Sequence, residues 1–211
     1  MDGRLERGEQ TRRLIVRRAA EIASAEGLET LSIGRLAADL GLSKSGVFAL
    51  FGSKEDLQLA TVRAARESVV SEVVRPALAA ENPLWAVIEL WLSYSERRVF
   101  PGGCFFSSVR PEFDSRPGRV RDEIASLGRE WEGLFERLAR DAGLPDPAQL
   151  AFEIVAILDA ANANSMLYDD ASAYDKARVA LRARIAMPTG TEINVATPND
   201  TSIASSGSST T

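Results

Sequence analysis

Apolar residues recur at helical spacing along most of the chain, and no alternating pattern typical of strands competes with them. The first run places Ile15, Ala19 and Ile22 on one face and stops at Gly27. Further helices are expected from about 54 to 74, ending ahead of Pro76, and over about 83–92, 117–142, 147–168 and 174–186. The pattern predicts an all-α fold.

Two short helices, each with its own start signal, are expected between residues 31 and 51. Ser32 and Ser43 stand where a hydroxyl can cap the first turn, and Gly41 ends the first of the two helices. Only Gly41 and Leu42 connect them, so the second helix must cross the first steeply. This is the geometry of a helix-turn-helix, which sets its second helix into the major groove of DNA.

The first turn of that second helix carries the side chains best placed to read bases, because the N-terminal residues of a recognition helix reach base edges. Lys44 can donate to guanine or to phosphate, Ser45 can serve either base class, and Gly46 lets the backbone approach closely. Phe48 can touch a thymine methyl group or a sugar. The alternative is structural: capping alone explains Ser43, a lysine can be an ordinary solvated side chain, and helix-turn-helix shapes also occur as plain corners.

At these residues the chain resembles the TetR family of bacterial repressors. Two departures leave fewer polar groups for DNA: Phe48 stands where the family usually has a tyrosine, and Ala49 with Leu50 replaces larger polar residues. The resemblance covers about 50 residues and rests on the helix that stops at Gly27 and on Ser32-Ile33, Leu36-Ala37, Gly41-Leu42-Ser43 and Phe51-Gly52-Ser53-Lys54-Glu55-Asp56-Leu57, where Ser53 and Asp56 form a capping box.

The resemblance implies an N-terminal three-helix, helix-turn-helix DNA-binding domain and a C-terminal helical domain for ligand binding and dimerisation. It also implies that Ser32 and Lys54, each at a helix start, grip phosphates, where the helix dipole helps. The expected parts are a basic arm (1–10), the DNA-binding domain (11–57), the ligand-binding and dimerisation domain (58–187) and a low-complexity, disordered tail (188–211). The expected DNA-binding residues are Ser32, Ser43, Lys44, Ser45, Gly46, Phe48 and Lys54.

The charge distribution is compatible with DNA although the formal net charge is −5. Residues 1–20 carry six arginines against three acidic residues, so the acidity falls on the remainder of the chain. A basic end on an acidic body fits a protein that touches DNA at one pole. The alternative is that the arginines form a merely solvated face.

Composition narrows the function further. The chain has no histidine, which removes the common Ser/His/Asp and Cys/His catalytic arrangements and disfavours zinc or haem ligation, so no enzyme activity, metal or cofactor is expected. The single cysteine, Cys104, excludes an intrachain disulfide and is interpreted as a buried small residue. With no secretory signal and no run of about 18 apolar residues expected to span a membrane, a cytoplasmic location is predicted.

The last two predicted helices favour a dimer. Leu150, Ile154 and Leu158 form one apolar stripe of the helix over 147–168, and further apolar residues lie beside it. A helix that is apolar on most sides must be buried on most sides. By the resemblance, these two helices pair with their copies in a second subunit, which would space two recognition helices about 34–36 Å apart for a palindromic site. The alternative is that this helix is the centre of a monomer.

An effector pocket is implied by the resemblance and suggested by aromatic and polar residues of the body. Buried polar groups on an otherwise apolar helix need partners, which a ligand can supply. The alternative is that aromatic residues at helical spacing belong to the core. The candidate residues are Trp91, Tyr94, Phe105, Trp131, Phe135, Asn162 and Ser165, and the expected effector is small and largely apolar.

The sequence therefore predicts a DNA-binding transcriptional regulator, a ligand-responsive repressor that binds a palindromic operator as a homodimer. Two alternatives stay open. Given Phe48, Ala49 and Leu50, the chain can be a helical small-molecule-binding dimer that has lost specific DNA binding. An all-helical enzyme is disfavoured by the missing histidines and by the absence of paired acids in a plausible pocket.

Overall fold

The computed structural model describes residues 3–186, with side chains from residue 6 onward, and every regular element in that range is helical. This confirms the all-α fold. The N-terminal elements are α1 (Gly3–Glu26), the 3₁₀ turn η1 (Leu28–Thr30), α2 (Ile33–Asp39), α3 (Lys44–Phe51) and α4 (Lys54–Val69). The body adds the π-helical turn η2 (Val70–Val74), α5 (Arg75–Leu78), α6 (Pro83–Glu96), α7 (Phe105–Phe113), α8 (Arg119–Asp141), α9 (Pro147–Tyr168) and α10 (Ser172–Ala186).

The N-terminal unit is built on the predicted caps. The hydroxyls of Ser32, Ser43 and Ser53 accept hydrogen bonds from the backbone three residues on, at the starts of α2, α3 and α4. Gly41 has a φ of 64° and ends α2, where the Leu42 N–H donates to the Ala37 carbonyl at 2.8 Å. Because the cap and the stop are both local, the connection between α2 and α3 is as short as the sequence predicts.

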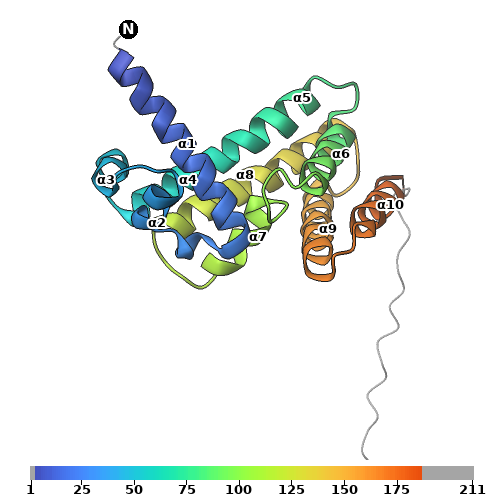
Figure 1. Ribbon diagram of the computed structural model, residues 1–211. Helices are drawn as coiled ribbons and strands as arrows, with labels where there is room; N and C mark the ends of the chain where they lie inside the picture. The colour runs from blue at the N-terminus through green and yellow to red at the C-terminus, as the bar shows by residue number, and fades with distance from the viewer. Residues whose placement is uncertain (1–2, 187–211) are drawn as a thin grey trace, which may run out of the picture.

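The body packs around the long helices α8 and α9. Helix α9 lies between α8 and α10, and α4 packs on both α1 and α8. Figure 1 shows α3 and the N-terminal half of α1 at one end of the molecule and α9 with α10 at the other. Helix α4 crosses the predicted boundary between residues 57 and 58, so it belongs to the DNA-binding unit at its start and to the body at its end.

The helix expected to end ahead of Pro76 continues through it, which is a correction to the sequence-based boundary. After α4 the chain widens into η2, where the Arg75 N–H donates to the Val70 carbonyl, five residues back. Pro76 has no N–H to donate, and in a regular helix its ring would clash with the carbonyl four residues earlier. A π-helical turn removes that conflict locally, so the chain continues into α5.

Helix α9 has two apolar faces of different exposure. Leu150, Ile154 and Leu158 are buried, whereas Phe152 and Leu167 on the opposite face are 61% and 75% exposed. Its 22 residues are long and apolar enough, by length and composition alone, to cross a membrane, so the expectation that no such segment exists was wrong. A core helix of a soluble protein passes the same test, and α9 packs on α8 and α10.

Helix α1 begins at Gly3, so most of the arm expected over residues 1–10 forms its first turns, and in Figure 1 they project beyond α2 and α3. The tail predicted over 188–211 lies outside the described residues.

Candidate nucleic-acid interface and adjoining cavity

Helix α3 presents its first turn to solvent. Lys44, Ser45 and Gly46 are exposed, and the Phe48 ring, one turn on, is 55% exposed. Val47 and Phe51 lie on the opposite side and are buried in the core of the N-terminal unit. The structure therefore brings four predicted DNA-binding residues together on one surface.

The start of α3 is held tightly by its cap. The Gly46 N–H donates to the Ser43 hydroxyl at 3.1 Å, and the Ser45 hydroxyl donates to the same oxygen at 3.4 Å. A Cβ atom at Gly46 would lie 2.9 Å from the Ser43 hydroxyl, so a side chain there would disturb the cap. Ser43 therefore has a structural role as the N-cap of α3, and its contact with DNA stays a prediction.

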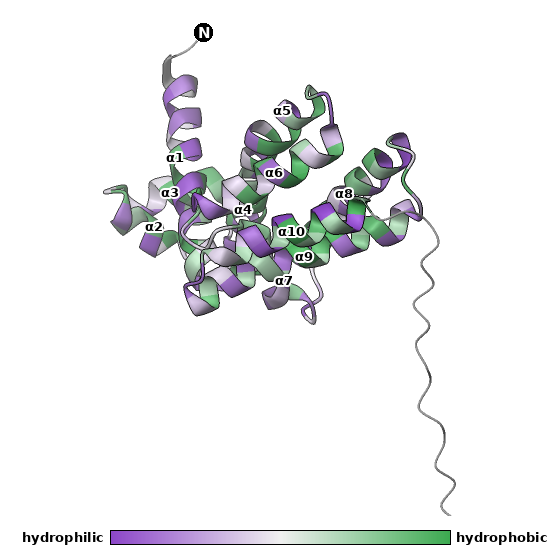
Figure 2. Cartoon of the chain, turned by 90° about the vertical axis from the view of Figure 1, so that its right-hand side faces the viewer, coloured by the Kyte–Doolittle hydropathy of each residue, from purple (hydrophilic) through white to green (hydrophobic). Residues whose placement is uncertain are grey.

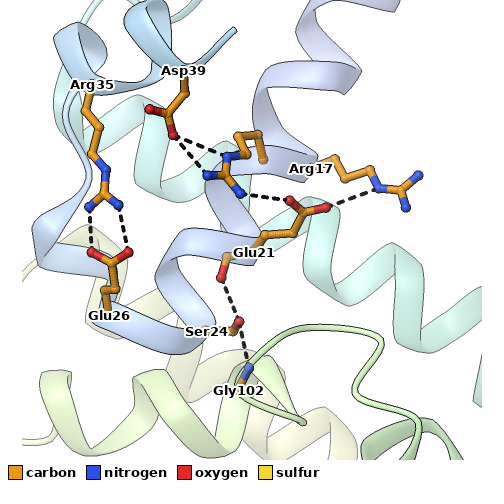
Figure 3. A network of polar contacts seen from close by, with 8 residues as sticks. Arg17, Glu21, Ser24, Glu26, Arg35, Asp39 and Gly102 are labelled. Carbon is orange, nitrogen blue, oxygen red and sulfur yellow. Dashed lines mark hydrogen bonds and ion pairs between the residues drawn. The ribbon is translucent and has the colours of Figure 1, made fainter.

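Ion pairs fix α2 against α1 (Figure 3). The Arg35 guanidinium donates to both carboxylate oxygens of Glu26 at 2.6 and 2.7 Å, which lowers the pKa of Glu26. Arg18 donates through Nε and Nη2 to Asp39 and through Nη1 to Glu21. Because α2 carries the turn into α3, these bonds orient the recognition helix.

The two predicted phosphate-binding residues have different surroundings. Ser32 is exposed at the start of α2 and accepts the Arg35 N–H at 3.1 Å. Lys54 Nζ donates to the Glu29 carbonyl at 2.6 Å and to its carboxylate at 3.2 Å, so this ammonium ties α4 to η1. The Gln58 amide and then Lys54 lower the pKa of the Glu29 carboxyl group. Phosphate would have to compete with Glu29 for Lys54.

Basic side chains of α1 lie at the same end of the molecule as α3. The Arg12 guanidinium stands 5.1 Å from the centre of the Phe51 ring, while Arg13 and Arg17 are exposed. Charge counting along the sequence identified this basic segment but did not single out Arg12, Arg13 or Arg17 as part of the site. Helix α1 adds positive charge beside the exposed turn of α3.

A tightly packed junction joins the N-terminal unit to the body. Glu112 of α7 accepts the backbone N–H groups of Leu28 and Glu29 at 2.7 and 2.8 Å, so a carboxylate from the body caps η1. The Gly102 N–H donates to the Ser24 hydroxyl of α1 at 3.2 Å (Figure 3). Asn162 of α9 holds the same loop from the other side, accepting the Cys104 N–H at 2.9 Å.

A cavity of about 320 Å³ lies in the body beside α4. Of the predicted pocket residues, Trp91 and Trp131 border it. Its other apolar walls, from η2, α5, α7, α8 and α9, were not predicted, because core and cavity residues share one helical spacing. These further apolar residues include Val70, Val74, Leu78, Phe106, Leu127, Leu134 and Leu158.

The remaining five predicted pocket residues do not border this cavity. Tyr94, Phe105 and Phe135 are fully buried in the core, and burial raises the pKa of the Tyr94 hydroxyl, which lies 2.9 Å from Ser68. Asn162 finds its partners in the loop at Gly102 and Cys104 rather than in a ligand. Ser165 is buried on α9, away from the cavity lining.

Charged residues also border the cavity. Arg66 of α4 lies 3.0 Å from Glu130 of α8, and Arg110 of α7 lies 2.7 Å from Asp159 of α9. Arg137 of α8 borders the cavity too, and no ion pair or hydrogen bond of its side chain is found within residues 6–186. In the same part of the chain no group of three or more Cys, Asp or Glu side chains is placed to hold a metal ion.

Two family models match the chain. Residues 15–61 match the model described as bacterial regulatory proteins, tetR family, and residues 80–181 match the tetracyclin repressor-like C-terminal domain. The first covers α2, α3, the second half of α1 and the first half of α4, and the second covers α6 to α9 and most of α10. A comparison with curated proteins gave no match.

Solved structures of similar fold agree with these models. A TetR transcriptional regulator from Chloroflexus aurantiacus is 27% identical, with 85% of this chain and 96% of that one covered, at a TM-score of 0.77. A TetR-family regulator from Streptomyces coelicolor is 19% identical over 84% and 94% of the two chains, at a TM-score of 0.74. AibR, solved with isovaleryl coenzyme A and operator DNA, is 20% identical over 70% and 83%, at a TM-score of 0.58.

Proposed function

Because the chain belongs to the TetR family of bacterial regulatory proteins, we propose that it is a ligand-responsive repressor that binds a palindromic operator as a homodimer. The observation that carries this proposal is the exposed first turn of α3. Lys44 and Ser45 offer donors to base edges there, while Val47 and Phe51 anchor the helix in the core. We further propose that Ser32, Ser43, Gly46, Phe48 and Lys54 complete the contacts with DNA.

The proposed dimer rests on an unpartnered apolar face. On α9, Phe152, Ala156, Ala160, Ala163 and Leu167 follow one another at helical spacing, and all five are exposed. Figure 2 views the molecule from the side of α9 and α10 and shows hydrophobic stretches on both helices. Small residues in the middle of this stripe allow two copies of α9 to approach closely. A second copy of this chain is the partner that we propose for this surface.

The proposed effector site is the cavity beside α4. Arg66, Val69 and Val70 border it, and they lie on the same continuous helical segment that begins at Lys54 in the DNA-binding unit. A ligand that favours one position of this segment would therefore shift the two recognition helices of the dimer relative to each other. AibR was solved with both a ligand and operator DNA, which supports the proposal that this chain has a ligand site in addition to its DNA surface.

We assign the protein no enzyme activity, and we place it in the cytoplasm with the DNA that it binds. Both assignments follow from the proposed regulatory function. The matched families are regulators, and neither model describes a catalyst.

Selection of genomic fragments by the purified protein at near-physiological salt tests the proposal. We expect enrichment of one palindrome whose half-sites are spaced by about one helical turn, with an affinity that falls steeply as salt rises because bound counterions are released. Enrichment of no fragment by a folded dimer would instead favour the alternative, a small-molecule-binding dimer without specific DNA binding.

A further inference from the structure

The cavity beside α4 has an apolar interior and an excess of positive charge at its border, and this combination specifies a ligand class. We propose that it binds an amphipathic monocarboxylate, a molecule with an apolar body and one anionic group, and that Arg137 recognises the anion. This inference rests on the proposed function in one respect, since it names the effector class of that regulator. The earlier expectation was only a small, largely apolar molecule.

The apolar body of such a ligand fits the cavity walls. Trp91, Phe106, Trp131 and Leu134 line it, and the Trp131 ring meets the Phe135 ring edge-on at 4.9 Å, which fixes its orientation. A volume of about 320 Å³ is at the lower end of the range for small-ligand sites, roughly 300–1,000 Å³. The site is therefore sized for a compact aliphatic or aromatic group.

The charges at the border do not balance. Three arginines face two acids: Arg66 pairs with Glu130 and Arg110 pairs with Asp159, which also accepts the Ser107 hydroxyl at 2.7 Å. Arg137 is left over, without an ion-pair partner within residues 6–186. One excess positive charge matches one carboxylate, and the planar guanidinium donates to both oxygens of that group.

A glycine of α8 borders this space. Gly128 lies in the middle of α8, where glycine weakens a helix relative to alanine, and a Cβ atom built on it meets no atom within 4 Å. Gly128 borders both the cavity and an open groove between α7, α8 and α9. A Cβ atom at this position therefore displaces no packed atom, and we expect a larger side chain there to extend into the space that Gly128 borders.

Tryptophan fluorescence can report binding without DNA. The chain has three tryptophans, two of which border the cavity, while Trp85 lies under the Arg182 guanidinium. In a Trp85→Phe background we would titrate octanoate, 1-octanol and octylamine, which share one apolar chain and differ only in charge. We expect octanoate to bind about tenfold or more tightly than octanol, because a hydrogen bond to a charged group strengthens binding by about that factor. We expect octylamine to bind least tightly of the three.

Matched variants locate the anion site. Arg137→Gln should abolish the preference for octanoate over octanol, whereas Arg129→Gln, which removes the same charge from α8 beside the groove, should keep it. Gly128→Leu should abolish binding of all three probes, and circular dichroism would establish that this variant is folded. Loss of the preference in both arginine variants would overturn the role of Arg137.

Two results would overturn the ligand class in the parent protein: octanol binding as tightly as octanoate, or no response to any probe. Neither affects the selection of genomic fragments, which needs no effector. An enriched palindrome without octanoate binding would support the proposed regulator and rule out this ligand class. Octanoate binding that depends on Arg137, without any enriched DNA, would uphold the site and overturn the repressor.

Discussion

At the scale of single residues, Lys44 is the side chain whose removal should weaken specific recognition most clearly. Lys44→Ala removes a donor from the exposed first turn of α3 without touching the core. If the ammonium contacts a base, affinity for the operator should fall by about 1–3 kcal/mol, while affinity for random DNA changes little. Fluorescence anisotropy with operator and scrambled duplexes measures both.

Two other lysines serve as controls for that prediction. Lys54→Ala should weaken binding to both duplexes alike, because a phosphate contact carries no sequence information. Lys176→Ala removes the same charge from α10, where the ammonium pairs with Asp170, and should leave both affinities unchanged. Equal affinities of Lys44→Ala and the parent protein for the operator would remove Lys44 from the recognition surface.

Gly102 tests the junction between the DNA-binding unit and the body. A Cβ atom there would lie 2.0 Å from the Ser24 carbonyl oxygen of α1, so Gly102→Ala must push the loop and the helix apart. We expect a loss of about 1–3 kcal/mol in the free energy of unfolding, seen as a fall of several degrees in Tm. Gly34→Ala, in α2, meets no atom within 4 Å and should leave Tm unchanged or slightly higher.

Residues with local roles could be predicted from the sequence, and residues with distant partners could not. Ser32, Ser43 and Ser53 cap their helices as predicted, because a cap involves only the next three residues. Asn162 was interpreted as a ligand group, but its partners lie about 60 residues away in the loop at Gly102 and Cys104. A single sequence gives no indication of that pairing.

At the scale of the element, Pro76 accounts for the π-helical turn after α4. Sequence rules for helix ends predict that the helix stops before this proline, not that a wider turn lets it continue. A proline inside a helix costs about 3 kcal/mol when the helix stays regular. Pro76→Ala should therefore let residues 70–76 return to α-helical bonding and should raise Tm, by less than the full cost because η2 already relieves the clash.

The matched control for this prediction is another proline that begins a helix. Pro83 occupies the first turn of α6, where its missing N–H has no partner to lose, so Pro83→Ala should give no gain in Tm. Val70 and Val74 of η2 border the cavity, and a changed turn should also change the affinity for octanoate. A Tm for Pro76→Ala at or below that of the parent protein would contradict the assigned cause of the turn.

At the scale of the whole molecule, operator binding at α3 should depend on dimerisation through α9. Ala156→Glu would place a charge in the middle of the exposed apolar stripe of α9. Buried charges without partners are costly, so we expect a folded monomer by light scattering and a large loss of operator affinity, although α9 lies at the other end of the molecule from α3. Ala79→Glu, an exposed site after α5, should remain dimeric and bind the operator normally.

Coupling between the cavity and the DNA surface gives the last prediction, and α4 is the reason for it. The helix carries Lys54 at one end and Arg66 near the other, and pairs with α8 through Arg63–Glu123 and Arg66–Glu130 at 2.9 and 3.0 Å. Octanoate at the cavity and operator at α3 therefore act on one element. We expect octanoate to weaken operator binding, typically by about 5–150-fold, and linkage then requires the operator to weaken octanoate binding by the same factor. Calorimetric titration of octanoate into protein with and without operator, and of operator into protein with and without octanoate, measures the two factors. Lys44→Ala should leave the octanoate affinity of the DNA-free protein unchanged, and a factor of one in both directions would show that the cavity is not coupled to the DNA surface.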